Sequence, residues 1–210
     1  MTLGRILTTD DCMREGAAWL ARAEPRFAAA LDLCGTPPLR RRADGFAALM
    51  GAIVSQQVST AAARAIQGRL DAAGLTEPAA IVAADDEALR TAGLSRQKIR
   101  YIRALAQAGI DFDALRTAPD DQVVATLVEI PGIGRWTAEI YAMFSLGRAD
   151  VFAPNDLALQ ESARLLFELP DRPKERALRE FAQPWSPWRT VAAGMLWHYY
   201  HHAKNREGIA

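Results

Sequence analysis

The sequence predicts an all-α protein, and three observations support that fold class. Apolar residues recur at helical spacing in most segments, as Trp19, Leu20 and Phe27 do near the start of the chain. Breaks rich in glycine and proline separate these segments, the first of them at Glu24-Pro25. No stretch alternates apolar and polar residues over the length of a half-buried strand.

The composition favours a globular protein that does not coat nucleic acid through its overall charge. The 210 residues are 50% hydrophobic, and 25 Lys and Arg balance 25 Asp and Glu, so the formal net charge is +0. A protein that binds DNA by bulk electrostatics would be strongly basic. Any contact with nucleic acid must therefore use local cations and shape.

Neither a membrane segment nor a disulfide framework is indicated. Asp10, Asp11 and other charged residues stand where a signal peptide would need an apolar run, and no segment approaches the ~20 apolar residues of a membrane helix. Cys12 and Cys34 are too few and too far apart for a zinc or iron–sulfur site. We expect a cytoplasmic, nucleoid-associated monomer with reduced cysteines.

Helix starts and stops can be placed in order along the chain. Helices are expected over residues 9–23, 26–33, 46–54, 60–70, 174–181 and 189–204. Further helices are expected to begin near residues 77, 86, 96, 120, 134 and 157. The stiff connector Pro37–Arg42 and the turn Gly147–Asp150 indicate two boundaries. The expected domains are residues 38–150, and residues 1–37 together with 151–210.

The stretch Pro131-Gly132-Ile133-Gly134 predicts a helix-hairpin-helix. Two glycines in three positions allow backbone angles that other residues avoid. The second helix then starts near Gly134, and the N–H groups of its first turn have no partner within the helix. Such a helix start is suited to phosphate, so Gly132, Gly134 and Thr137 are candidate contacts to a DNA backbone. The alternative is an ordinary corner between two helices with a glycine turn.

Two further residues stand at a definite spacing behind this hairpin. Trp136 lies in the first turn of the second helix, and Asp156 follows twenty positions later (156 − 136 = 20), after Val151-Phe152-Ala153-Pro154-Asn155. Asn155 or Asp156 should cap the helix that begins at Leu157. A plain helix start is the alternative interpretation of such a capping residue.

Taken together, the segment LVEIPGIGRWTA followed at this distance by DVFAPND closely resembles the helix-hairpin-helix (HhH-GPD) superfamily of DNA glycosylases. Within it the resemblance is to the branch of 3-methyladenine DNA glycosylase II, and it covers the chain from Phe46 onward, including the C-terminal PW.PWR..AAGMLW pattern. The resemblance implies a two-lobed fold with a six-helix, barrel-like domain at 38–150 and an active site in the cleft between the domains. It also implies hydrolysis of the N-glycosidic bond of alkylated purines flipped out of duplex DNA, as in base excision repair.

Asp156 is the candidate catalytic residue. Breaking the bond between a base and deoxyribose builds positive charge on the sugar, which a fixed carboxylate stabilises. The same carboxylate is also suited to orient or deprotonate the attacking water, and the sequence does not separate these two roles.

The base pocket should be aromatic, because the base has to leave the duplex and stack on the protein. Trp136 offers the main face, and Tyr141, Trp185 and Trp188 are lesser candidates. An alkylated purine is cationic, which strengthens its stacking on an indole and makes it a good leaving group without protonation. Ile140 stands where some relatives have an aromatic residue, so the far wall of the pocket is not defined.

The segment Ser55-Gln56-Gln57-Val58-Ser59 closes a mostly apolar helix. Adjacent glutamines suit the reading or wedging of bases, because an amide both donates and accepts. By the resemblance, Gln56 lines the base pocket and Gln57 enters the base stack of the DNA duplex as a wedge. The same segment also suits a polar turn in which Ser59 caps the next helix, and the two interpretations are compatible.

A second backbone contact and a cation site complete the expectations. The turn before Ser95 and Lys98 shares three features with the hairpin, namely a glycine turn, a capped helix start and nearby cations. An ordinary capped surface helix explains this turn equally well. By the resemblance, the carbonyls of Val128, Ile130 and Ile133 would bind a structural Na⁺ or K⁺ under the hairpin.

No cofactor is expected for catalysis. Relatives that also nick the strand have a lysine where this chain has Trp136, so a Schiff-base step is not expected. The histidines at 198, 201 and 202 share a helix with no acidic or cysteine partner at metal-binding spacing. Two rival functions stay open, namely a glycosylase for mismatched thymine, uracil or oxidised purine, and a non-catalytic helix-hairpin-helix module that binds DNA.

Overall fold

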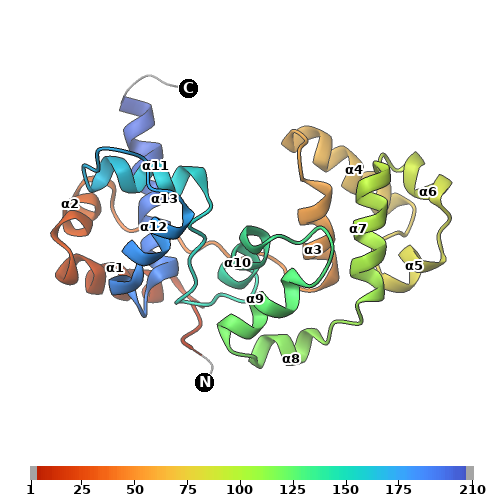
Figure 1. Cartoon of the computed structure of the whole chain (residues 1–210), viewed down its shortest axis with the longest axis horizontal. Helices are drawn as coiled ribbons and strands as arrows, with labels where there is room; N and C mark the ends of the chain where they lie inside the picture. Colours follow the sequence, from red (N-terminus) through yellow and green to blue (C-terminus); the bar gives the residue numbers. More distant parts are fainter. Residues whose placement is uncertain (1–3, 207–210) are drawn as a thin grey trace. The chain divides into compact units, whose positions relative to one another are not determined.

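The computed structural model describes residues 4–206, with side chains as far as residue 204, and its helices are drawn in Figure 1. Within this part of the chain, the regular structure is helical and contains no strand beyond an isolated bridge between Ile6 and Arg148. The prediction of an all-α fold is confirmed. The chain forms two compact units, Met1–Arg41 with Ala142–Ala210, and Arg42–Tyr141.

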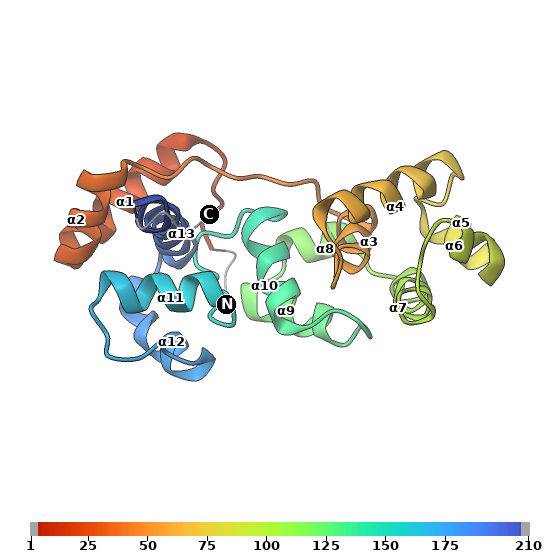
Figure 2. The same ribbon diagram turned by 90° about the horizontal axis from the view of Figure 1, so that it is seen from above.

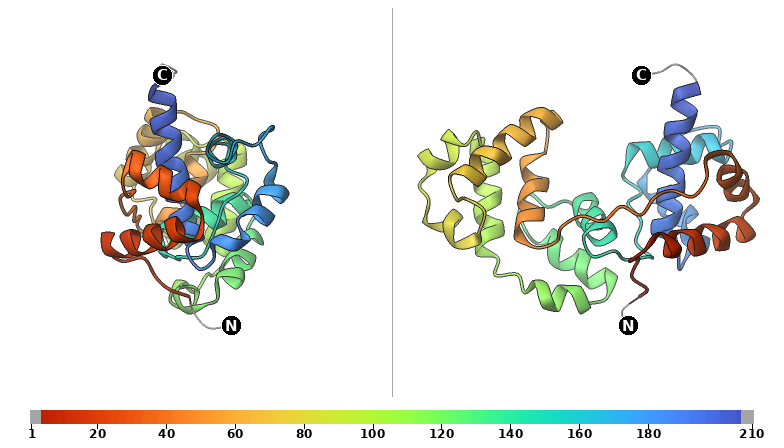
Figure 3. Two further views of the ribbon diagram at one scale, coloured as in Figure 1. Left: turned by 90° about the vertical axis from the view of Figure 1, so that its left-hand side faces the viewer. Right: turned by 180° about the vertical axis from the view of Figure 1, so that it is seen from behind.

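The first unit is built around the C-terminal helix α13 (Arg189–Arg206). It packs against α1 (Asp10–Ala23), α2 (Pro25–Cys34) and α11 (Leu157–Leu166), and both views of Figure 3 place α13 beside α1 and α2. The short helices α12 (Glu175–Phe181) and η1 (Gln183–Trp185) complete this unit, and Figure 2 shows α12 beside α11.

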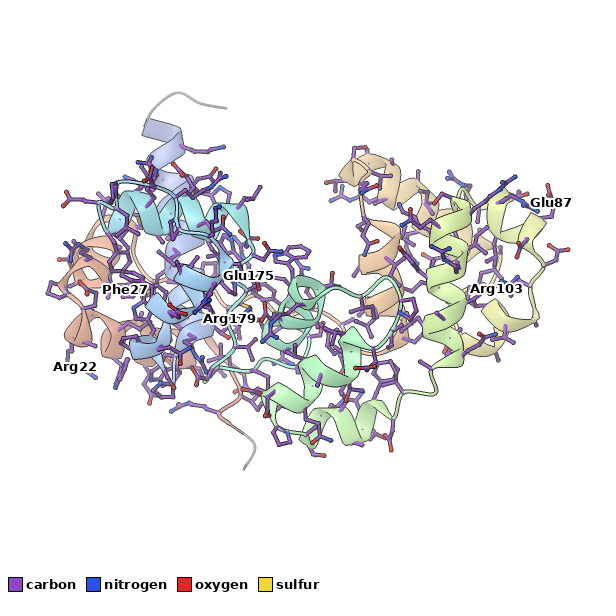
Figure 4. All side chains as sticks on the ribbon, viewed as in Figure 1. Arg22, Phe27, Glu87, Arg103, Glu175 and Arg179 are labelled. Atoms are coloured by element: carbon purple, nitrogen blue, oxygen red, sulfur yellow. The ribbon has the colours of Figure 1, made fainter. Side chains whose placement is uncertain are left out.

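An aromatic cluster fills the core of the first unit. Trp185 stacks on Phe167 with ring centroids 5.7 Å apart and meets Phe27 edge to face at 5.1 Å, and Figure 4 labels Phe27 within this unit. Trp185 and Trp188 are each only 4% exposed. The prediction that these two tryptophans are additional pocket aromatics is therefore wrong, because their rings are packed inside the protein.

The second unit contains α3 to α9 and the first part of α10. The helices have the following bounds: α3 Phe46–Val54, α4 Thr60–Ala72, α5 Pro78–Ala83, α6 Asp86–Thr91, α7 Arg96–Gln107, α8 Phe112–Thr117, α9 Asp120–Val128 and α10 Arg135–Phe144. This is more than the expected six. The sequence analysis did not include α8, whose N-cap Asp111 accepts a hydrogen bond from the backbone N–H of Ala114 at 2.9 Å.

Helix α7 is the centre of the second unit and packs against α3, α5 and α6 (Figure 1). Its buried residues Ile99, Ile102 and Leu105 lie three apart and form one apolar stripe. From the same helix, the Arg103 guanidinium donates to the carbonyls of Ile81 at 3.2 Å and Ala84 at 2.8 Å (Figure 4). These bonds hold the turn between α5 and α6 against α7.

The division between the units lies at 41/42 and 141/142, whereas the expected limits were 38 and 150. Backbone hydrogen bonds explain the second difference, because the N–H of Leu7 donates to Gly147 at 2.7 Å and that of Ala149 donates to Arg5 at 3.0 Å. The Arg41 side chain explains the first, since it donates to the carbonyls of Leu7 and Ser145. Both segments are thereby tied into the first unit.

Candidate nucleic-acid interface and candidate active-site carboxylate

A tight hairpin joins α9 to α10 in the second unit. The N–H of Ile133 donates to the carbonyl of Ile130 at 3.0 Å, and α10 begins directly after Gly134. Gly132 has φ +94, and a Cβ there would lie 2.4 Å from Cγ of Tyr101. Both the backbone angle and the close approach of Tyr101 therefore require glycine at this position.

Gly134 has a different role from Gly132. Its φ lies outside the left-handed region, and a Cβ built on it would meet no atom within 4 Å. Of the two glycines that allow unusual backbone angles, only Gly132 adopts one. Gly134 leaves open space at the start of α10, where the N–H groups of the first turn have no partner within the helix. Thr137 belongs to this first turn, but its side chain is buried.

Three segments of the second unit are joined into one surface, which we call the hairpin surface: residues 55–58, 93–98 and 131–134. The Gln56 amide Nε2 donates to the carbonyl of Gly132 at 2.9 Å. The Lys98 ammonium donates to the carbonyl of Val54, the last residue of α3, at 2.6 Å. Tyr101 of α7 touches the hairpin at Gly132. The candidate residues of this unit are therefore held in a fixed arrangement around the hairpin.

The loop after α3 exposes Gln57 and holds Gln56 half-buried. Gln57 has φ 55, a left-handed conformation that residues with a Cβ rarely adopt. Ser59 accepts a hydrogen bond from the N–H of Ala62 and caps α4, as predicted. The loop thus carries an exposed glutamine on a strained backbone next to a capped helix.

The start of α7 differs in part from what the sequence indicates. Ser95 caps the helix by accepting from the N–H of Lys98 at 3.3 Å, which confirms the predicted cap. The Lys98 ammonium, expected to contact phosphate, is instead bound to the Val54 carbonyl, and burial lowers the pKa of Lys98. The exposed cations at this helix start are Arg96 and Arg100, and Arg100 lies over the Tyr101 ring at 5.5 Å.

Two aromatic residues of α10 occupy contrasting environments. The Trp136 side chain is exposed, with 42% of the residue's surface accessible. Tyr141 is buried, its hydroxyl accepts a hydrogen bond from the N–H of Gly45 at 2.9 Å, and burial raises its pKa. The accessible aromatic face of α10 is therefore that of Trp136, and Tyr141 links α10 to the start of α3.

Asp156, in the first unit, is the N-cap of α11. Its Oδ1 accepts hydrogen bonds from the backbone N–H groups of Ala158 at 2.9 Å and Leu159 at 3.0 Å. It also accepts one from the indole Nε1 of Trp197 at 3.2 Å. The cap predicted at Asn155 or Asp156 is therefore made by Asp156. The sequence analysis did not single out Trp197, because no local pattern relates it to a residue 41 positions earlier.

Buried polar side chains fix the backbone on both sides of Asp156. The Gln160 amide donates to the carbonyl of Pro154 at 2.8 Å, which holds the loop that enters α11. The Ser162 hydroxyl donates to the carbonyl of Leu196 at 2.6 Å, which fixes α11 against α13. The Thr190 hydroxyl lies 2.6 Å from the carbonyl of Arg148, near the start of the same loop. Asp156 is therefore presented by a rigid backbone.

The described residues form neither a metal-binding cluster nor a membrane-spanning helix. They include no group of three or more His, Cys, Asp or Glu side chains that could hold a metal ion. His198 instead lies 2.9 Å from the carbonyl of Cys34. None of the helices in residues 4–206 is both long and apolar enough to cross a membrane.

Comparison with known proteins identifies the family. The model of the HhH-GPD superfamily of base excision DNA repair proteins matches residues 50–187, and this chain belongs to that superfamily. Over 71% of its length it is 32% identical to DNA-3-methyladenine glycosylase 1 of Schizosaccharomyces pombe, and the match covers 69% of that relative.

Two solved structures are similar over nearly the whole chain. The crystal structure of a DNA-3-methyladenine glycosidase from Bacillus halodurans matches with a TM-score of 0.84 and 34% identity, covering 96% of this chain and 94% of that one. A 3-methyladenine DNA glycosylase of Schizosaccharomyces pombe in complex with abasic DNA matches with a TM-score of 0.74 and 29% identity, covering 87% of this chain and 95% of that one.

Proposed function

We propose that this chain is a DNA-3-methyladenine glycosylase, which hydrolyses the N-glycosidic bond of alkylated purines in duplex DNA. The observation that carries the proposal is a carboxylate, Asp156, held by three N–H donors at the start of a helix. Membership of a base excision repair family and the names of the relatives support the same substrate class.

In this proposal Asp156 acts on the sugar. The developing cation of deoxyribose is attracted to a carboxylate, and at 4 Å and an effective dielectric of 20 that attraction is about 4 kcal/mol. At about 1.4 kcal/mol per decade, this alone supplies roughly a thousandfold acceleration. The same carboxylate would also orient the attacking water, and both roles require its charge and its fixed position.

Trp136 is proposed to hold the flipped base. Its exposed indole offers a stacking face, and a cationic alkylated purine is attracted to that face more strongly than a neutral base. Such a base leaves without protonation, so no dedicated general acid is needed. Gln56 is proposed to border the base and Gln57 to fill the gap in the duplex.

The hairpin surface is proposed to bind the DNA backbone. Phosphate would approach the open side of Gly134 and the N–H groups of the first turn of α10. The capped start of α7 at Ser95, with Arg96 and Arg100 exposed nearby, offers a second contact. In this arrangement Lys98 stabilises the hairpin surface through its hydrogen bond to the Val54 carbonyl.

A monovalent cation under the hairpin is part of the proposal. Val128 is the last residue of α9, so its carbonyl lies at the negative end of the helix dipole, which suits a cation. The Ile130 carbonyl accepts the N–H of Ile133 and has a second lone pair. Together with the Ile133 carbonyl, these groups fit Na⁺ or K⁺, whose contribution when bound would be to stiffen the hairpin.

We further propose that the chain acts as a monomer and leaves the DNA strand intact. A lyase step needs a nucleophilic amine at the site, and Trp136 occupies the position of the lysine in relatives that cut the strand. Borohydride should therefore trap no covalent adduct between the protein and lesion-bearing DNA. A trapped adduct would show that the enzyme has lyase activity after all.

The experiment that tests the function uses a panel of duplexes with one modified base each. The purified protein is incubated with 3-methyladenine, 7-methylguanine, uracil, a T·G mismatch or 8-oxoguanine, and abasic sites are then cleaved with alkali. Release of methylated purines, without added divalent metal or nucleotide, is the expected result. Release only of uracil, thymine or the oxidised base would change the substrate class, and release of none would indicate a non-catalytic DNA-binding module.

A further inference from the structure

One oxygen of Asp156 gathers more donors than a helix cap needs. Oδ1 accepts from the backbone N–H groups of Ala158 and Leu159, which is what an N-cap requires. The third donor, the Trp197 indole, comes from α13 and lies 3.2 Å from the same oxygen. Capping does not account for this bond, which therefore calls for another explanation.

The residues on both sides of Trp197 are anchored to other helices, Leu196 through its carbonyl and His198 through its ring. The carbonyl of Leu196 accepts the hydroxyl of Ser162, a residue that is 0% exposed. On the other side of Trp197, the His198 ring lies 2.9 Å from the carbonyl of Cys34 in α2. These two anchors fix the position of α13 at the point where the indole leaves it.

The indole ring itself also has a fixed neighbour. The Phe144 ring lies against it with centroids 5.6 Å apart and an interplanar angle of 35°. Together with the two anchors, this contact leaves the Trp197 N–H aimed at Oδ1 before any ligand binds. A donor that is already oriented in the free protein needs little reorganisation during the reaction.

We propose that Trp197 is a positioning residue for Asp156, an inference that rests on the proposed function. A carboxylate held by its own cap alone can rotate about the bond between Cβ and Cγ. A rotation that exchanges the two oxygens of Asp156 would break three hydrogen bonds. One of these bonds is to the Trp197 indole, whose position is fixed. Trp197 therefore fixes the direction of the second carboxylate oxygen, which is the direction that matters to a sugar cation or a water molecule.

The test removes the indole N–H and keeps the ring. In Trp197→Phe, and in a protein carrying 3-benzothienylalanine at position 197, the ring can still pack on Phe144 but donates nothing to Asp156. We expect the maximal single-turnover rate of 7-methylguanine excision to fall at least about tenfold, as for loss of a hydrogen bond to a charged group. Affinity for abasic-site DNA should stay unchanged. A normal rate with the benzothienyl analogue would overturn the proposal.

A double-variant cycle separates positioning from direct contact with the base. If Trp197 acts only through the carboxylate, Trp197→Phe should cost less than about twofold when introduced into Asp156→Asn. Losses that multiply in the double variant would instead mean that Trp197 touches the substrate, which overturns the positioning role. Near-normal excision by Asp156→Asn itself would refute the role of Asp156 in the proposed function, a different result from the failure of Trp197 alone.

A matched control makes the same chemical change elsewhere in the unit. Trp185→Phe shrinks a buried indole in the aromatic core, where the ring packs on Phe27 and Phe167. It should lower the melting temperature and leave the excision rate of the folded protein unchanged. If Trp185→Phe slowed excision as much as Trp197→Phe, the effect would be one of general packing, and the proposal would be overturned.

Discussion

The hairpin surface is open, whereas the polar side chains that fix the backbone around Asp156 are buried. On the hairpin side, Trp136 is 42% exposed and Gly134 has no atom near its missing Cβ. Around Asp156, Gln160 is 6% exposed, Ser162 0% and Thr190 4%, and each makes a hydrogen bond to a backbone carbonyl. The two regions thus differ in how much of their geometry the protein fixes by itself.

This difference fits the different tasks proposed for them. Phosphate binding needs N–H groups and cations that are accessible to a large, strongly charged ligand, and the ligand contributes much of the order. Stabilisation of a developing cation needs a charge that is already in place, because reorganisation during the reaction would raise the barrier. Substitutions in the two regions should therefore change different measured quantities.

The largest effect is expected for Asp156→Asn. The amide keeps the shape and can still accept the helix-capping hydrogen bonds, but it lacks the charge that the sugar cation needs. Excision should fall about a thousandfold, in line with the Coulomb estimate of about 4 kcal/mol. Thermal unfolding and binding to abasic-site DNA should change little. Near-normal single-turnover excision by the folded variant would refute the mechanism.

Gly134→Glu should act on binding alone. The space beside Gly134 is empty, so the side chain fits without strain, but its charge meets the phosphate expected there. Like charges brought together cost several kcal/mol, so affinity should fall roughly a hundredfold for damaged and undamaged duplexes alike. Gly134→Ala is the neutral control. An effect confined to lesion-bearing DNA would mean that the hairpin does not anchor the backbone.

Trp136→Ala should reduce both DNA binding and excision. Loss of a stacking face costs about 1–3 kcal/mol, and it should weaken recognition of the base as well as its release. Affinity for a duplex with a modified purine should drop more than affinity for abasic-site DNA. Equal losses on both duplexes would show that Trp136 contacts the backbone and not the base.

The smallest effect on DNA binding is expected for Lys98→Met. Its ammonium is bound to the Val54 carbonyl, so the variant should lose about 1–3 kcal/mol of folding stability, measured by urea unfolding. The salt dependence of DNA binding should keep the slope of the parent protein. A slope reduced by about one would mean that Lys98 contacts a phosphate, as the sequence alone suggests.

Local features of the site could be predicted because their causes are local. Ser59, Ser95 and Asp156 each cap a helix within three residues of themselves, and Gly132 is required by the turn in which it lies. Helix boundaries followed from the same rules. The exception is α8, which has six residues like α5 and α6 and was missed although its N-cap Asp111 follows the same rule.

Contacts between distant positions left no comparable signal. Trp197 reaches Asp156 across 41 residues, and Lys98 reaches Val54 across 44. Trp185 and Trp188 look like exposed aromatics in a proline-rich turn, yet the packing of the first unit buries them. Such outcomes depend on which helices meet, which composition and spacing do not specify.

The strained backbone at Gln57 implies that this side chain is kept at a cost in folding stability. A residue with a Cβ in the left-handed region costs about 1–2 kcal/mol, and a glycine there would avoid that cost. Gln57→Gly should therefore raise the free energy of unfolding while removing the side chain proposed to enter the duplex. A variant that is more stable but slower to find a lesion would show that the chain tolerates a weaker fold in order to keep an amide at this place.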